Sequence, residues 1–84
     1  MTETIRRIID EEGRLAVAVA SLDDTTNLYD AGLTSHASVN LMLALEDAFD
    51  IEFPDEMLQK QTFESVAAIR ASLEELVGAS IAPT

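Results

Sequence analysis

Residues 31–53 read A-G-L-T-S-H-A-S-V-N-L-M-L-A-L-E-D-A-F-D-I-E-F, and this stretch decides how the chain is expected to fold. A loop containing Gly32 leads into an apolar segment of helical period, with Ser35 at the junction. One helical face is formed by Leu41, Met42, Leu45 and Phe49. Val39 and Leu43, four residues apart, lie towards the edge of that face. Either both sides of the helix are buried by its neighbours, or these two residues form an apolar strip open to a partner.

The segment before this stretch predicts one long helix and one long loop. Residues 2–20 place apolar side chains three or four positions apart, which predicts a helix that starts at Thr2 or Thr4. Gly13 lies inside this pattern and is expected to loosen or bend the helix. Residues 21–34 lose the period and are rich in Ser, Asp, Thr and Asn, which is typical of a loop. The apolar residues that are expected to hold this loop down are Leu22, Leu28 and Tyr29.

The segment after this stretch predicts a short helix and then a longer one. Pro54 disfavours helix before it and suits the start of a third helix of one or two turns. Thr62 is the predicted cap of a last helix, and Gly78 is its predicted end. Residues 79–84 are then expected to form a frayed tail of a single domain that spans residues 1–84.

The composition favours an all-α fold. The chain has 84 residues, of which 48% are apolar and only 5% aromatic, and Ala, Leu and Glu are abundant. It contains no cysteine, which excludes disulfides, zinc–thiolate sites and cysteine nucleophiles. It also shows neither a signal-peptide pattern nor an apolar run long enough to span a membrane. A cytoplasmic protein is therefore expected.

The net charge of −11 constrains the partners. Such a field repels nucleic acid and anionic lipid and attracts proteins that carry basic patches, although the acids can also serve solubility alone. Catalysis by this chain is not expected, because Ser35 and His36 are adjacent on a helix and point about 100° apart. The acids do not follow the spacing of a calcium-binding loop, so no metal site is expected either.

Ser35 has two interpretations at the start of its helix. It can serve simply as the N-cap of that helix. Alternatively, its hydroxyl is exposed at the positive end of the helix, where a phosphate diester is electrostatically favoured.

Residues 30–56 resemble the central segment of acyl carrier proteins and of the related aminoacyl and peptidyl carrier proteins. The family's loop of the form D-x-G-x-x-S is matched by Asp30, Gly32 and Ser35. Its helix of the form V-x-L-x-x-x-L-E-x-x-F is matched by Val39, Leu41, Leu45, Glu46 and Phe49, and its following turn by Pro54 and Asp55. The resemblance implies a four-helix bundle with a long loop between the first two helices and a short third helix.

The resemblance also implies the function of Ser35 and of the surface around it. A phosphopantetheinyl transferase would esterify Ser35 with 4′-phosphopantetheine from coenzyme A, and the thiol of this arm would carry the cargo as a thioester. The chain, a monomer when free, would have no catalytic residue of its own. The acids expected to contact basic patches on partner enzymes are Glu46, Asp47, Glu52, Asp55 and Glu56. Val39 and Leu43 would add apolar contacts.

Two departures from the family pattern indicate the cargo. Fatty-acid carriers typically have Asp-Ser-Leu where this chain has Thr34, Ser35 and His36, and they often keep an acid at the position of Asn40. The chain is more similar to bacterial carriers charged with an amino acid by ligases that resemble tRNA synthetases. Asn40 and His36 are then candidate partner contacts, unless His36 is merely solvated. The alternatives are an acyl carrier for fatty-acid, lipid or polyketide synthesis and an unmodified acidic adaptor.

Overall fold

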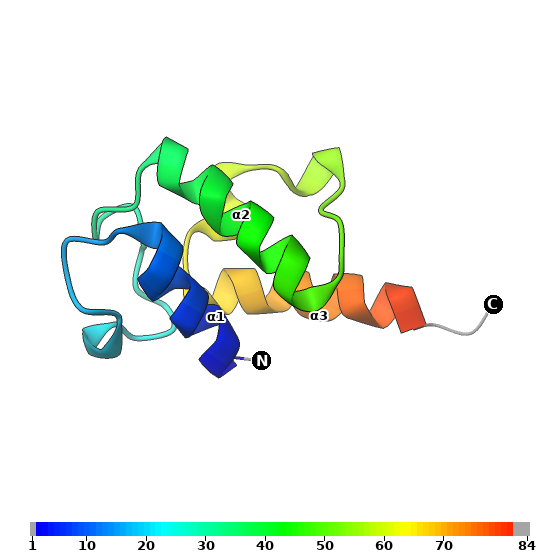
Figure 1. Cartoon of the computed structure of the whole chain (residues 1–84), viewed down its shortest axis with the longest axis horizontal. Helices are drawn as coiled ribbons and strands as arrows, with labels where there is room; N and C mark the ends of the chain where they lie inside the picture. Colours follow the sequence, from blue (N-terminus) through cyan, green and yellow to red (C-terminus); the bar gives the residue numbers. More distant parts are fainter. Residues whose placement is uncertain (1, 82–84) are drawn as a thin grey trace.

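The first helix ends sooner than its apolar spacing predicts. In the computed structural model, which describes the backbone of residues 2–81 and the side chains of residues 2–77, α1 spans Thr2–Ile8 (Figure 1). It continues as a single π-helical turn, η1 (Ile9–Gly13). Arg14 follows in the left-handed conformation with φ of 50°, which ends the helix. The prediction of a helix to residue 20 is therefore wrong, although the expected change at its glycine is confirmed.

Tertiary hydrogen bonds explain why the helix does not continue. The N–H of Ala16 donates to the carbonyl of Ala31 at 3.0 Å, across the loop, instead of to the preceding helical turn. The Arg6 guanidinium donates to the carbonyls of Val19 and Leu22 at 3.1 and 3.0 Å. Residues with helical spacing in the sequence thus contact the core from a loop, which a local pattern cannot indicate.

The long loop between α1 and the next α-helix is fixed to the rest of the fold. It contains a 3-10 turn, η2 (Val19–Ser21). Leu28 is fully buried, and its N–H donates to the carbonyl of Glu64 at 2.7 Å. The carbonyl of Asp24 accepts the N–H of Ala67 at 2.8 Å. The prediction that apolar anchors hold this loop down is confirmed.

The second half of the chain contains two α-helices and two 3-10 turns. α2 spans Ser35–Phe49, η3 spans Asp55–Met57, η4 spans Lys60–Phe63 and α3 spans Val66–Ile81. The expected short third helix is thus a single 3-10 turn. Over residues 2–81 the fold is all-helical, with three α-helices and no strand.

The last helix differs from its prediction at both ends. Its cap is Ser65, whose Oγ accepts the N–H of Ala68 at 3.0 Å, and not Thr62. The helical backbone also continues through Gly78, which was expected to end it. Residues 79–81 of the predicted frayed tail belong to this helix instead, and residues 82–84 lie outside the described residues.

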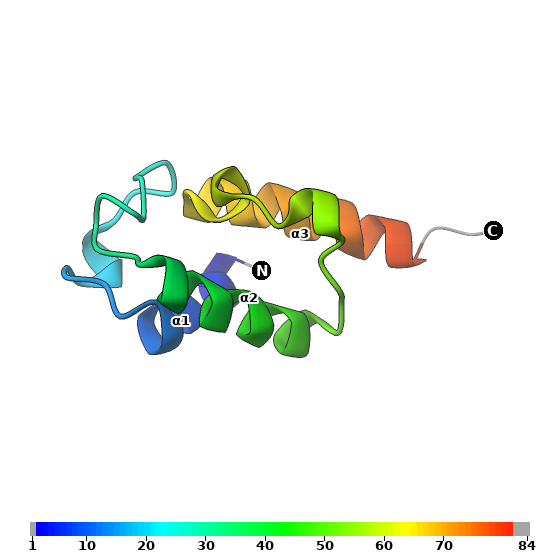
Figure 2. The same cartoon turned by 90° about the horizontal axis from the view of Figure 1, so that it is seen from above.

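α1 packs against both α2 and α3, and the core lies between the three (Figures 1 and 2). The largest fully buried side chains are Ile5, Ile9, Leu28, Leu41, Leu45, Val66, Ile69 and Leu73. Segment 50–65 runs from the end of α2 back towards its start, so that η4 lies near the long loop (Figure 2). None of the helices in the described part of the chain is both long and apolar enough to cross a membrane.

Candidate functional site

Thr34, and not Ser35, caps α2. The Thr34 Oγ1 accepts the N–H of Ala37 at 3.0 Å, and Ser35 is the first helical residue. Ser35 is exposed, and its hydroxyl makes no hydrogen bond within residues 2–77, although its carbonyl accepts the Ser38 hydroxyl at 2.7 Å. The interpretation of Ser35 as a simple N-cap is therefore wrong. Its hydroxyl lies at the positive end of a helix of 15 residues and has no hydrogen-bond partner within residues 2–77.

The residues around Ser35 set its direction. Leu33 and Ala37 are both buried, and the N–H of Leu33 donates to the carbonyl of Leu28 at 2.9 Å. Gly32, with φ of +116°, turns the chain where it passes Ala16, and a Cβ on this glycine would lie 2.8 Å from the Ala16 nitrogen. Because these residues fix the phase of α2, Ser35 faces outward.

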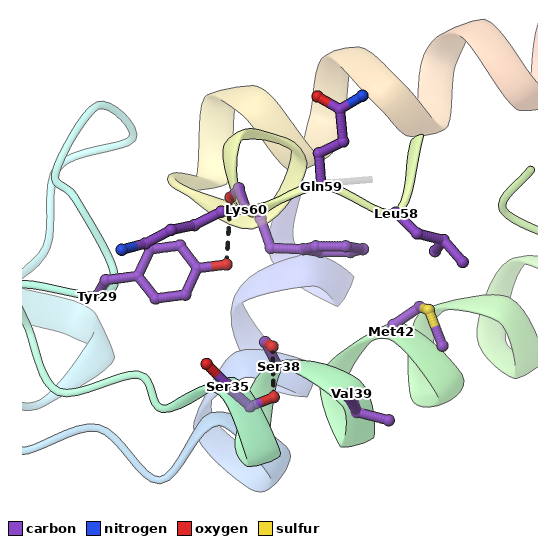
Figure 3. A pocket seen from close by; sticks show the side chains of 9 residues that line it. Tyr29, Ser35, Ser38, Val39, Met42, Leu58, Gln59 and Lys60 are labelled. Carbon is purple, nitrogen blue, oxygen red and sulfur yellow. Dashed lines mark hydrogen bonds between the residues drawn. The ribbon is translucent and has the colours of Figure 1, made fainter. Parts of the chain in front are cut away.

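An open groove of about 390 Å³ adjoins Ser35 (Figure 3). It lies between the first turns of α2 and residues 58–63, with Tyr29 at one end. Its lining residues are Tyr29, Ser35, Ser38, Val39, Met42, Leu58, Gln59, Lys60 and Phe63. The groove thus has a polar end beside Ser35 and an apolar wall farther along α2.

Tyr29 and Lys60 form the polar end together. The Tyr29 hydroxyl donates to the Lys60 carbonyl at 3.1 Å, and the Lys60 Nζ lies 4.8 Å from the centroid of the Tyr29 ring (Figure 3). Burial raises the pKa of Tyr29; the Ser38 hydroxyl opposes this shift and the Glu64 carboxylate adds to it. Sequence reasoning treated Tyr29 only as a loop anchor and missed Lys60. No local pattern could have paired them, because they are 31 positions apart in the sequence.

His36 and Asn40 lie on a different face of α2 from the groove. They line a second hollow of about 340 Å³ together with Arg14 and Thr34. No imidazole or carboxylate hydrogen-bonds to the Ser35 hydroxyl in the described part of the chain, so Ser35 lacks the base that a catalytic serine needs. The exposed Ser35 hydroxyl has room to hold an attached group.

The predicted apolar strip is open to solvent. Val39 and Leu43 are 51% and 52% exposed, so the alternative in which both sides of α2 are buried is excluded. Val39 also borders the groove. The strip therefore begins beside Ser35 and continues one turn farther along the helix.

Four of the five predicted partner-binding acids are exposed: Asp47, Glu52, Asp55 and Glu56. Glu46 is half-buried, and its Oε2 accepts the N–H of Phe53 at 2.8 Å. Within the described residues, no three His, Asp or Glu side chains are grouped so as to hold a metal ion.

Residues 3–70 match the family described as "Phosphopantetheine attachment site". The chain is also similar to a curated relative, an aminoacyl carrier protein of Agrobacterium fabrum. The two sequences are 47% identical over 74 residues, which are 88% of this chain and 89% of the relative.

Two solved structures extend this similarity. One is a carrier protein from Agrobacterium tumefaciens, in complex with an engineered Bradyrhizobium japonicum glycine:[carrier protein] ligase and AMP. It shares 47% identity and a TM-score of 0.86 over 88% of this chain and 99% of that chain. The other is a glycylated carrier protein in complex with the Bradyrhizobium japonicum ligase. It shares 31% identity and a TM-score of 0.73 over 84% of this chain and 95% of that chain.

Proposed function

Because the chain belongs to the family of carrier proteins with a phosphopantetheine attachment site, we propose that Ser35 bears 4′-phosphopantetheine and that the arm holds an aminoacyl group. The observation that carries this assignment is the Ser35 hydroxyl, which is exposed and without a hydrogen bond in the described residues because Thr34 does the capping. The chain is a carrier and not an enzyme, so its residues position the arm and contact partners.

The residues around Ser35 fit a phosphodiester. The free N–H groups and positive end of α2 favour a negative charge at its first residue. In the proposed modification the Ser35 oxygen bonds to the phosphorus of coenzyme A that carries the pantetheine, and the bond from this phosphorus to the bridging oxygen of the pyrophosphate breaks. The Ser35 proton passes to the transferase, and 3′,5′-ADP leaves. When attached, the group supplies a thiol that can form a thioester.

The proposed source of the cargo is an amino acid:carrier protein ligase. Support comes from the two similar carriers that were solved with a glycine:[carrier protein] ligase. The exposed strip of Val39 and Leu43 and the acids after it would meet a ligase surface with an apolar patch and basic residues. In this arrangement η3, which carries Asp55 and Glu56, takes the place of the third helix of a four-helix bundle.

The test of the modification is the intact mass after incubation with coenzyme A and a broad-specificity phosphopantetheinyl transferase. The wild-type protein should gain the mass of one phosphopantetheinyl group and Ser35→Ala should gain none. Ser38→Ala, changed one turn farther along the same helix, is the matched control and should still be modified. Modification of Ser35→Ala would contradict the assignment, and no gain in any variant would favour the unmodified adaptor.

Identifying the cargo requires a second experiment. The modified protein is incubated with ATP and either an amino acid and its carrier ligase or a fatty acid and an acyl–carrier ligase, and the thioester is weighed. We expect loading with the amino acid. Loading with long acyl chains alone would instead support a carrier for fatty-acid, lipid or polyketide synthesis.

A further inference from the structure

The basic residues are distributed unevenly around the molecule. The chain has five, and Arg6, Arg7 and Arg70 each form an ion pair with a carboxylate. Within residues 2–77, Arg14 and Lys60 form none. Both lie near Ser35, but Lys60 borders the groove that includes Ser35, whereas Arg14 borders the second hollow.

Lys60 contacts Tyr29 through both its backbone carbonyl and its side chain. Its carbonyl accepts the Tyr29 hydroxyl, and its Nζ lies over the Tyr29 ring, 4.8 Å from the centroid. A cation over an aromatic face at an exposed site gains about 0.5–1 kcal/mol, enough to bias an otherwise flexible lysine towards one position. Figure 3 shows Lys60 and Tyr29 on one side of the groove and Ser35 on the other.

The groove changes from polar to apolar with distance from Ser35. Ser38, Tyr29 and Lys60 lie at the polar end, and Met42 and Leu58 form walls farther along (Figure 3). A phosphopantetheine arm changes in the same order, since its phosphodiester is followed by a branched dimethyl group. The second hollow is lined by Gly13, Arg14, Thr34, His36, Ala37 and Asn40, and none of these is a large apolar side chain such as Met42 or Leu58.

We propose that Lys60 is the counter-ion of the arm's phosphodiester and that the branched part of the arm lies in the groove between Met42 and Leu58. The inference rests on the proposed modification of Ser35. The chain has a net charge of −11, so its overall field repels a phosphodiester beside α2. A cation close to the phosphodiester offsets this repulsion. Lysine suits the role because its ammonium is a compact point charge.

Because Lys60 is the only lysine and Tyr29 the only tyrosine, both can be followed without ambiguity. The protein is first converted to the phosphopantetheinylated form, which is verified by mass. The intact protein is then acetylated, both before and after conversion. The rate at which the Lys60 amine reacts is read from the mass of the peptide that contains Lys60. We expect conversion to slow acetylation about twofold to fivefold, as an exposed ion pair allows. The ratio of the two acetylation rates should approach one at high salt, because salt screens exposed charges.

A matched pair of variants tests whether Lys60 is the cation beside the phosphodiester. In the wild type, conversion should shift the ring resonances of Tyr29 in NMR spectra. Lys60→Gln should reduce that shift, while Arg14→Gln, which removes the same charge from the second hollow, should leave it unchanged. Both side chains are exposed, so the variants are expected to fold.

The outcomes separate this inference from the proposed function. A mass gain with unchanged Lys60 reactivity and unchanged Tyr29 resonances would overturn the counter-ion assignment and leave the carrier function intact. Loss of the Tyr29 shift in Arg14→Gln but not in Lys60→Gln would also overturn it. Failure of the mass gain would overturn both.

Discussion

The carboxylate of Glu46 in α2 accepts the backbone N–H of Phe53, 2.8 Å away in the segment that returns from this helix. Removal of a half-buried charged acceptor leaves that N–H unpaired, so Glu46→Ala should lower the free energy of unfolding by about 1–2 kcal/mol. Glu46→Gln keeps an acceptor and should cost less. Urea unfolding followed by circular dichroism measures both, and Asp47→Ala, on the exposed face, is the control.

Neutral amide variants of the same two residues separate stability from partner binding. Asp47→Asn should weaken the ligase interaction more than Glu46→Gln does, because the Asp47 side chain is exposed and has no hydrogen-bond partner in the described residues. An equal loss of affinity in the two variants would show that Glu46 contacts the partner as directly as Asp47 does.

Gly32 and Gly13 should respond oppositely to alanine. At Gly32 the φ of +116° and the 2.8 Å approach to the Ala16 nitrogen leave no room for a Cβ, so Gly32→Ala should cost about 2–4 kcal/mol. At Gly13 a Cβ would meet side chains at 3.4 Å or more, and Gly13→Ala should be neutral or stabilise by up to ~1 kcal/mol. Thermal and urea unfolding measure both, and a stable Gly32→Ala protein would contradict the turn geometry.

Leu43 and Leu45 are two positions apart in α2 and differ in burial. Leu45 is fully buried, so Leu45→Ala should lower the free energy of unfolding by about 2–5 kcal/mol. Leu43 is 52% exposed, and Leu43→Ala should change stability by no more than about 0.5 kcal/mol. Titration with the ligase should nevertheless show weaker binding by Leu43→Ala. Unchanged affinity would remove Leu43 from the proposed contact surface.

Tyr29 should make stability fall at alkaline pH. Burial, aided by Glu64 and opposed by Ser38, raises its pKa above the usual 10.0, so the folded protein holds the phenolic proton more tightly than the unfolded chain. This contribution is complete below pH 10 and is lost as the pH rises through the pKa of the folded state. Urea unfolding across this range should show a steeper decline for the wild type than for Tyr29→Phe. Equal slopes would show that the tyrosine is unperturbed.

The sequence predicted α2 well because local and tertiary signals agree there. Gly32, the apolar period and Phe49 all place the helix where it is found. The first helix was predicted too long because Val19 keeps helical spacing while packing against the core from a loop. Its end depends on partners distant in the chain, such as Ala31 for the Ala16 N–H, and no local pattern reveals these.

The site was predicted in part. The exposure of Ser35 and the open strip of Val39 and Leu43 followed from the motif and the period. The alternative in which Ser35 is the cap was one residue late, because Thr34 and Ser35 are both good caps. The groove could not be predicted. Its far wall is irregular chain around Leu58 and Lys60, whose position depends on tertiary contacts such as the one with Tyr29.

Thr34 caps α2 and Ser35 does not, and this affects how partners recognise the loaded carrier. Since Thr34 alone holds the end of α2, the fold does not depend on the state of the Ser35 hydroxyl. Under the proposed attachment, the apo, modified and charged forms present the same helices, the same acids and the same apolar strip. An enzyme that acts on only one form must therefore read the arm and its cargo directly, and a partner that contacts only protein surface outside the groove binds empty and charged carriers alike.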